Sequence, residues 1–208
     1  MIPYLFQLTN IVGPIVYWAA AVLLVMVSLC CAAFALRFPR RPLVYISGGT
    51  LAGALAVLSI PGPSAPPLVH VLLGIASLAL AIVGGGPAAQ LVLALASRGS
   101  VAAGAHGGIV VADREDTPRF GGTHEVLRGG THEVLRGGTT IGFLERLAIA
   151  GSVMAGFPTA LAVIIAIKGV GRFTELDAPE ARERFIIGTL VSFSWACACA
   201  GIVLLAAR

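Results

Sequence analysis

Long uncharged apolar runs are separated along the chain by segments that are charged or rich in proline or glycine. The runs cover residues 11–36, 43–60, 68–97, 147–167 and 185–207. Each is close to or longer than the roughly 20 residues that a helix needs to cross a bilayer. The pattern predicts an all-α integral membrane protein with about five transmembrane helices.

The third run contains the sequence GGGP at residues 84–87. Glycine weakens a helix, and proline removes a backbone donor and clashes with the preceding turn. We therefore predict one span with a hinge or kink at this point, with a re-entrant turn as the alternative.

The pattern divides the chain into three regions. Residues 1–97 form an N-terminal region of three spans, and residues 141–208 form a C-terminal region of two spans. Between them, residues 98–140 are expected to form a long, polar, glycine-rich loop.

Composition agrees with a membrane protein and opposes a soluble one. Hydrophobic residues make up 57% of the chain and charged residues 12%, and the mean hydropathy is +0.93; soluble domains carry about 25% charged residues. The net charge is +4, but the basic residues flank the spans and form no basic stripe with interleaved aromatics. The expected surroundings are therefore a lipid bilayer and not nucleic acid.

The distribution of basic residues predicts an orientation in the cell membrane. With five spans, the first loop, the third loop and the C-terminal end would lie on the same side of the membrane and carry ten Lys and Arg residues. The other side would carry four. Because basic residues are retained in the cytoplasm, we expect the N-terminus outside and the C-terminus inside.

An eight-residue sequence, GGTHEVLR, occurs twice in succession at residues 121–136. Each copy begins like the zinc-protease motif HExxH, but Arg128 and Arg136 stand where the second histidine belongs. Two short strands joined at residues 129–130 would place Leu127 opposite His132, with His124 on the other face of the ribbon. Since the two histidines could not share a metal, we interpret the tandem repeat as a duplicated linker, with pH sensing or metal binding as the alternative.

The remaining chemistry-bearing residues indicate neither a metal nor a cofactor. Cys30, Cys31, Cys197 and Cys199 all lie in apolar runs, where a free cysteine acts as a small hydrophobe; lipid acylation at the first two is an alternative. The chain contains no nucleophile elbow, P-loop or dinucleotide fingerprint.

Small residues recur at four-residue spacing in two spans. Gly49 with Gly53 and Ala196 with Ala200 would let helix backbones approach closely. Such faces favour self-association or another membrane protein as a partner.

Three motifs follow one another in the last third of the chain. They are IGFLER at residues 141–146, KGVGRFTEL at 168–176 and ERFIIGTLVS at 183–192. This order resembles the C-terminal part of small multi-span bacterial membrane proteins that are frequent in actinobacteria. It is also similar to the membrane-spanning tail of proteins with domain of unknown function 3307. The resemblance covers about 70 residues and implies a membrane architecture without an assigned activity.

The same motifs supply the candidate functional residues, a set of charged side chains: Glu145, Arg146, Lys168, Arg172, Glu175, Glu183 and Arg184. In a single fourth span, Lys168 would lie about 35 Å from Glu145. The set would then form two clusters on opposite sides of the membrane. They would anchor helix ends or, alternatively, form a binding or partner site, and we expect Arg172 to pair with Glu175 or Glu183.

These observations favour a non-catalytic structural, accessory or regulatory membrane component. The alternative is a transporter or channel component for a small solute, for which a broken helix at residues 84–87 would be the relevant feature. Transport pathways need ionisable residues at bilayer depth, and the predicted spans contain only His70, near one end.

Overall fold

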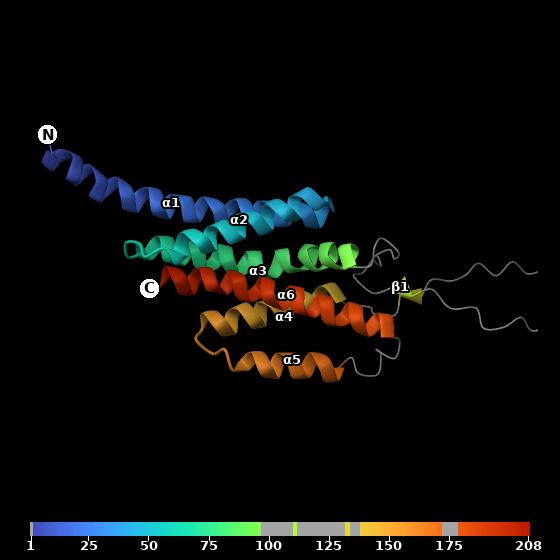
Figure 1. The fold of residues 1–208 in the computed structure, drawn as a ribbon. Coiled ribbons are helices and arrows are strands. Elements are labelled where there is room, and N and C mark those ends of the chain that lie inside the picture. The colour runs from blue at the N-terminus through green and yellow to red at the C-terminus, as the bar shows by residue number, and fades with distance from the viewer. Residues whose placement is uncertain (1, 97–109, 112–131, 134–137, 172–178) are drawn as a thin grey trace, which may run out of the picture.

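The computed structural model describes residues 2–96, 110–111, 132–133, 138–171 and 179–208. Within these ranges the chain forms six helices arranged as a bundle (Figure 1). The helices are α1 (Ile2–Arg37), α2 (Arg41–Ser59), α3 (Pro67–Ala96), α4 (Gly138–Met154), α5 (Ala160–Gly171) and α6 (Pro179–Ala206). The predicted all-α class is therefore confirmed.

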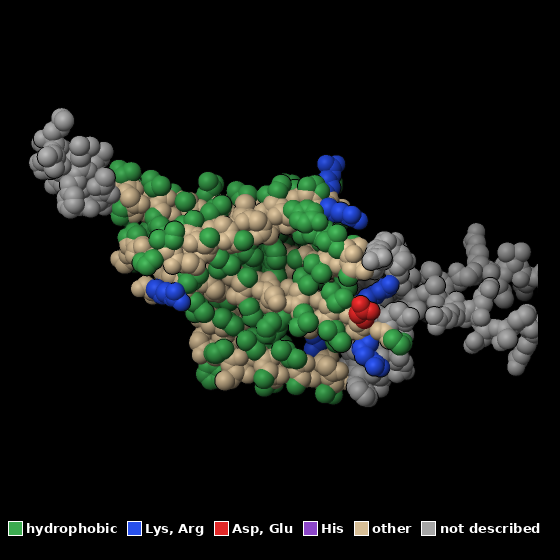
Figure 2. All heavy atoms as spheres, in the orientation of Figure 1, with side chains coloured by type: hydrophobic (Ala, Val, Ile, Leu, Met, Phe, Trp, Pro, Cys, Tyr) green, Lys and Arg blue, Asp and Glu red, His purple; other side chains and the backbone are tan. Residues whose placement is uncertain are grey.

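Four of these helices are long and apolar enough to cross a membrane. The qualifying segments are Val12–Arg37, Arg41–Ser59, Pro67–Ala96 and Ala181–Ala206. Large apolar side chains such as Leu23 and Leu190 lie on their outer surfaces. Figure 2 shows hydrophobic side chains along the flanks of the bundle, with most Lys and Arg side chains at the end where α1 finishes. This is the surface that a lipid environment requires.

The predicted single span over residues 147–167 is wrong. The chain forms α4, turns at residues 155–159, and returns as α5. In Figure 1, α4 begins and α5 ends at the same end of the bundle, so the two helices form a hairpin. As a result α1 begins and α6 finishes at one common end, whereas five crossing helices would separate them.

The hairpin has a local cause in the sequence AGFP at residues 155–158. Gly156 has φ +76°, its N–H donates to Val153 O, and the Phe157 N–H donates to Ser152 O. These two bonds form a Schellman motif, in which a left-handed glycine terminates a helix. Pro158 follows and prevents the helix from continuing.

Residues 84–87 lie within one continuous helix, as predicted, and the alternative of a re-entrant turn is wrong. Helix α3 continues without interruption from Pro67 to Ala96 and includes Pro87. It packs most extensively against α6, and the glycines provide the space for that packing, as described below.

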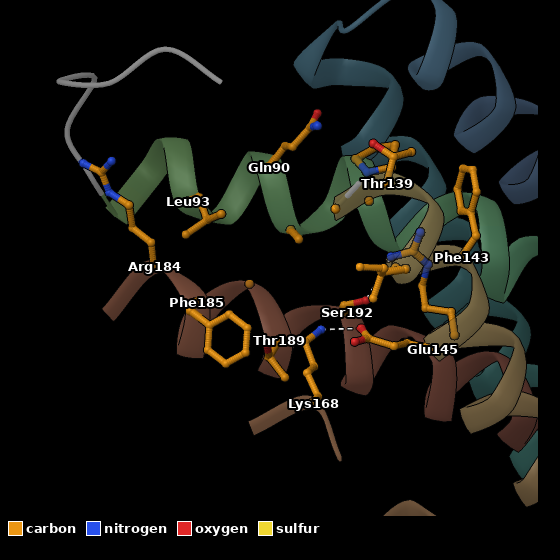
Figure 3. A pocket seen from close by; sticks show the side chains of 18 of the residues that line it. Gln90, Leu93, Thr139, Phe143, Glu145, Lys168, Arg184, Phe185, Thr189 and Ser192 are labelled. Carbon is orange, nitrogen blue, oxygen red and sulfur yellow. Dashed lines mark hydrogen bonds and ion pairs between the residues drawn. The ribbon is translucent and has the colours of Figure 1, made fainter. Parts of the chain in front are cut away.

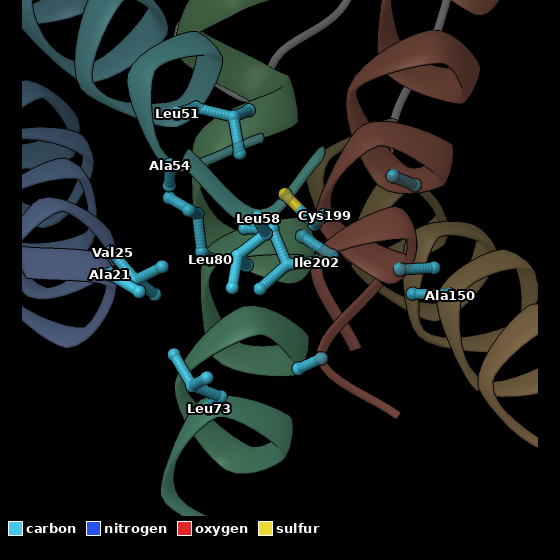
Figure 4. Packing of buried hydrophobic residues seen from close by; sticks show 14 of the residues in the cluster. Ala21, Val25, Leu51, Ala54, Leu58, Leu73, Leu80, Ala150, Cys199 and Ile202 are labelled. Atoms are coloured by element: carbon cyan, nitrogen blue, oxygen red, sulfur yellow. The ribbon is translucent and has the colours of Figure 1, made fainter. Parts of the chain in front are cut away.

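A continuous cluster of buried apolar side chains holds the long helices together (Figure 4). Val25, Leu58, Leu80 and Ile202 come from α1, α2, α3 and α6 respectively, and all are almost fully buried. A polar contact adds to the α1–α2 interface, because the Ser28 and Ser47 hydroxyls each donate to the other residue's carbonyl oxygen at 2.8 and 2.9 Å. Such interhelical hydrogen bonds stabilise helix pairs in lipid.

The two predicted small-residue pairs differ in their surroundings within the bundle. Ala196 and Ala200 of α6 are completely buried. In α2, by contrast, a Cβ at Gly49 would meet no atom within 4 Å, so this glycine makes no close helix contact.

Between α3 and α4 the structure describes two short strands. β1 (Val110–Val111) and β2 (His132–Glu133) pair antiparallel, with Val111 opposite His132. The predicted partner of His132 was Leu127, which lies outside the described residues, as does the first copy of the repeat. The second copy thus supplies a strand that pairs with a segment preceding the repeat.

Candidate functional site: a cationic cavity between α3, α4, α5 and α6

A cavity of about 220 Å³ lies between four helices, toward the end of the bundle where α3 finishes and α4 and α6 begin (Figure 3). Its walls are the last turns of α3, the first turns of α4, Lys168 of α5 and the first half of α6, and Leu36 at the end of α1 also contributes to the lining. The charged side chains that line it are Glu145, Arg146, Lys168 and Arg184.

Arg146 lies at the inner wall of the cavity and is only 5% exposed. Its Nε donates to the Ile82 carbonyl oxygen of α3 at 2.8 Å, and its Nη1 donates to the Ser192 hydroxyl of α6 at 3.1 Å. The guanidinium also lies over the Phe143 ring, 5.3 Å from its centroid. This one side chain therefore connects α4 to both α3 and α6.

The glycines of the GGGP sequence make room for these contacts. A Cβ at Gly85 would lie 2.4 Å from Arg146 Cδ, and a Cβ at Gly84 would lie 2.5 Å from the Trp195 ring. Trp195 Nε1 in turn donates to the Leu80 carbonyl oxygen at 3.1 Å. The glycines thus form a flat surface on α3 that accepts one large side chain from α4 and another from α6.

Glu145 and Lys168 form an ion pair across the α4–α5 hairpin (Figure 3). Their side chains are 15% and 19% exposed, so most of the pair is shielded. The Lys168 ammonium is also 5.7 Å from the centroid of the Phe185 ring of α6. Since none of the α5 side chains is buried, this pair is the main polar link between α5 and the rest of the bundle among the described residues.

The electrostatic character of the cavity is cationic. Its described lining contains three basic side chains and one carboxylate, which leaves a net charge of +2. The carboxylate is engaged by Lys168, while Arg146 is hydrogen-bonded to uncharged oxygens. Because the charges are guanidinium and ammonium groups, the cavity is suited to an anionic group and not to a metal ion.

Candidate residues that were expected to lie far apart are close together in the structure. Glu145 and Lys168 were expected on opposite sides of the membrane, and that prediction is wrong because the hairpin returns α5 to the end where α4 begins. Arg184 joins them at the cavity, whereas Glu183 is exposed and does not line it. Arg172 and Glu175, with their predicted pairing, lie outside the described residues.

Sequence reasoning missed the partners of Arg146 and the hairpin that assembles the site. Ser192 and Trp195 carry no pattern that distinguishes them from other polar or aromatic residues in an apolar helix. The hairpin did have a signal, because glycine followed by proline two residues later is typical of a helix C-terminus. The apolar run through residues 155–159 concealed it.

Comparison with known proteins finds no match among protein-family models, curated proteins or solved structures.

Proposed function

We propose that this protein is a non-catalytic accessory or regulatory component of the cell membrane that holds a small anionic ligand in the cavity between α3, α4, α5 and α6. The observation that carries the proposal is the net positive cavity, in which the Arg146 side chain is almost fully buried. Burial of a charge that far from water is costly, so an ionisable residue in such a place indicates a functional site.

The proposed membrane topology places this cavity at the cytoplasmic face. Thirteen of the fourteen Lys and Arg residues are found near the helix ends at that face or in the sequence segments that connect these ends. Three are near the α1–α2 connection, six run from Arg98 to Arg146, and four run from Lys168 to Arg184. Only Arg208 is at the other end. Four spans with a hairpin between the third and fourth therefore satisfy the positive-inside rule better than five spans, and they put both termini outside.

The function is tested by asking whether the protein retains a ligand. The protein is purified gently from native membranes and then denatured. We expect it to release a small anionic compound in near-stoichiometric amount, which mass spectrometry detects. Arg146→Leu should release none, whereas Arg41→Gln, at an exposed position outside the cavity, should release as much as the natural chain. Equal small-molecule content in both variants would contradict the proposal.

Transport of a small anion is the second candidate function. The observation that favours it is the short helix α4, whose N-terminal turns line the cavity, since short helices with their N-termini at a binding site are typical of transporters. Liposomes containing the protein should then release a radiolabelled anion faster than empty liposomes. Binding without flux would leave the accessory function as the better description.

A further inference from the structure

The cavity has properties that identify the chemistry of its ligand. We propose that it is a phosphate-binding site, in which Arg146 and the first turn of α4 hold a phosphate group that belongs to a lipid headgroup or is free in solution. This inference rests on the proposed function and adds the ligand class to it.

The guanidinium of Arg146 retains unused binding capacity. Nε and Nη1 are hydrogen-bonded, but Nη2 donates no hydrogen bond within the part of the chain that the structure describes. This nitrogen lies close to Gly86 and Gly142, whose added Cβ atoms would be 3.8 and 3.6 Å from it, and all three residues line the cavity. The guanidinium therefore presents free donors to the cavity, in the geometry that binds phosphate oxygens.

The carboxylate that could neutralise Arg146 is directed elsewhere. Glu145 is adjacent in sequence, but its side chain extends to Lys168 in Figure 3. Since the Ile82 carbonyl and the Ser192 hydroxyl that accept from Arg146 are uncharged, its buried charge lacks a directly bonded counterion among the described residues. A buried cation in this condition is stabilised by any anion that reaches it.

The start of α4 contributes a second attraction for an anion. Gly138, Thr139, Ile141 and Gly142 belong to its first turns, and all of them line the cavity. The first turn contains no acidic residue that would neutralise the positive end of this 17-residue helix. A helix N-terminus with a nearby arginine is a recurrent arrangement for phosphate groups.

Size and charge favour phosphate over other anions. A volume of about 220 Å³ is below the roughly 300–1,000 Å³ of pockets for drug-sized ligands, so the bound group is small. The net charge of +2 matches a phosphate monoester dianion better than a carboxylate, which carries one charge. Arg184 contributes one of these charges from the first turns of α6.

Two binding measurements on the purified full chain test the proposal. In uncharged detergent at constant ionic strength, inorganic phosphate is titrated by calorimetry. In parallel, native mass spectrometry compares retention of phosphatidic acid, a phosphomonoester lipid, with retention of phosphatidylcholine. We expect saturable binding of one phosphate or one phosphatidic acid per chain. Binding of phosphate alone identifies the free ion as the ligand, and binding of the lipid alone identifies a headgroup.

Variants locate the binding in the cavity. Arg146→Lys keeps the charge but loses the planar fork, and should weaken binding about tenfold or more. Gly142→Ala keeps the arginine but places a Cβ 3.2 Å from its Nη1, and should also weaken binding. Arg41→Gln removes an exposed charge outside the cavity and should bind normally; size-exclusion profiles check that each variant is folded.

Three results would overturn the proposal: no binding of either probe, unchanged binding by both cavity variants, or an equal loss in Arg41→Gln. If both probes fail but the protein still releases another Arg146-dependent anion from native membranes, the phosphate assignment is wrong and the proposed function stands. If no compound is retained in either experiment, the phosphate assignment and the proposed function are both wrong.

Discussion

Arg146 and the Glu145–Lys168 pair show how adjacent charged residues acquire different roles. Helical geometry places neighbours about 100° apart, so Arg146 faces α3 and α6 while Glu145 faces α5. The buried arginine fixes α4 in the bundle. The ion pair closes the hairpin, and its energy depends on the partial exclusion of water around both groups.

Reversal of one member of the pair should destabilise the protein. Glu145→Lys places a second ammonium beside Lys168 and should cost on the order of 3 kcal/mol in unfolding free energy, because the shielded partner loses its counterion. Combination with Lys168→Glu should recover most of the loss. Thermal unfolding in detergent measures both, and a double variant no more stable than Glu145→Lys would contradict the pairing.

The glycines of α3 should differ sharply in their tolerance of a methyl group. Gly85→Ala would force Arg146 out of its groove and should cost about 1–3 kcal/mol, as overpacking usually does. Gly74→Ala lies in the same helix with nothing within 4 Å of its Cβ, so it should be neutral or stabilising by up to about 1 kcal/mol. Similar melting temperatures for the two variants would show that the Arg146 side chain does not approach Gly85 closely in solution.

At the scale of elements, the α4–α5 hairpin depends on the end of α4. Gly156 adopts a left-handed conformation that costs other L-residues about 1–2 kcal/mol. Pro158 reinforces the turn because its ring opposes helix continuation. The hairpin in turn positions Lys168. The turn at Gly156 therefore decides that Lys168 lines the cavity, although the two residues are about three helical turns apart.

Gly156→Ala should therefore destabilise the hairpin by about 1 kcal/mol or more. Gly151→Ala is the matched control, because this residue lies within α4 and its Cβ would meet nothing within 4 Å. We expect the control to be neutral or slightly stabilising. Thermal unfolding of both variants checks the difference, and an equal effect would indicate that α4 continues through residue 156.

At the scale of the whole molecule, the hairpin changes the proposed number of crossings from five to four. Single cysteines at exposed positions test this with a membrane-impermeant reagent applied to intact cells. Ser64→Cys and Arg208→Cys should be labelled from outside, and Arg40→Cys should be labelled only after permeabilisation. Labelling of positions 64 and 208 from opposite sides would restore the five-span topology.

The sequence by itself determined the helical membrane class, the approximate bounds of α2 and α3, the C-terminal ends of α1 and α6, and the charged residues of the site. It did not predict that α1 begins at Ile2 and α6 at Pro179. Long apolar runs and their flanking charges are local features, and the cost of burying charge in lipid makes them reliable. Glu145, Arg146, Lys168 and Arg184 were candidates because they are charged residues of the three motifs in the last third of the chain.

Only the tertiary structure decided how these parts meet. The sequence GGGP predicts a hinge within one span, but it does not reveal that Arg146 and Trp195 fill the space above its glycines. The run at residues 147–167 reads as one span, yet it divides at Gly156 and brings Lys168 back to Glu145. Hydropathy records how apolar a segment is but not its direction, and helix direction decides which charges share a cavity.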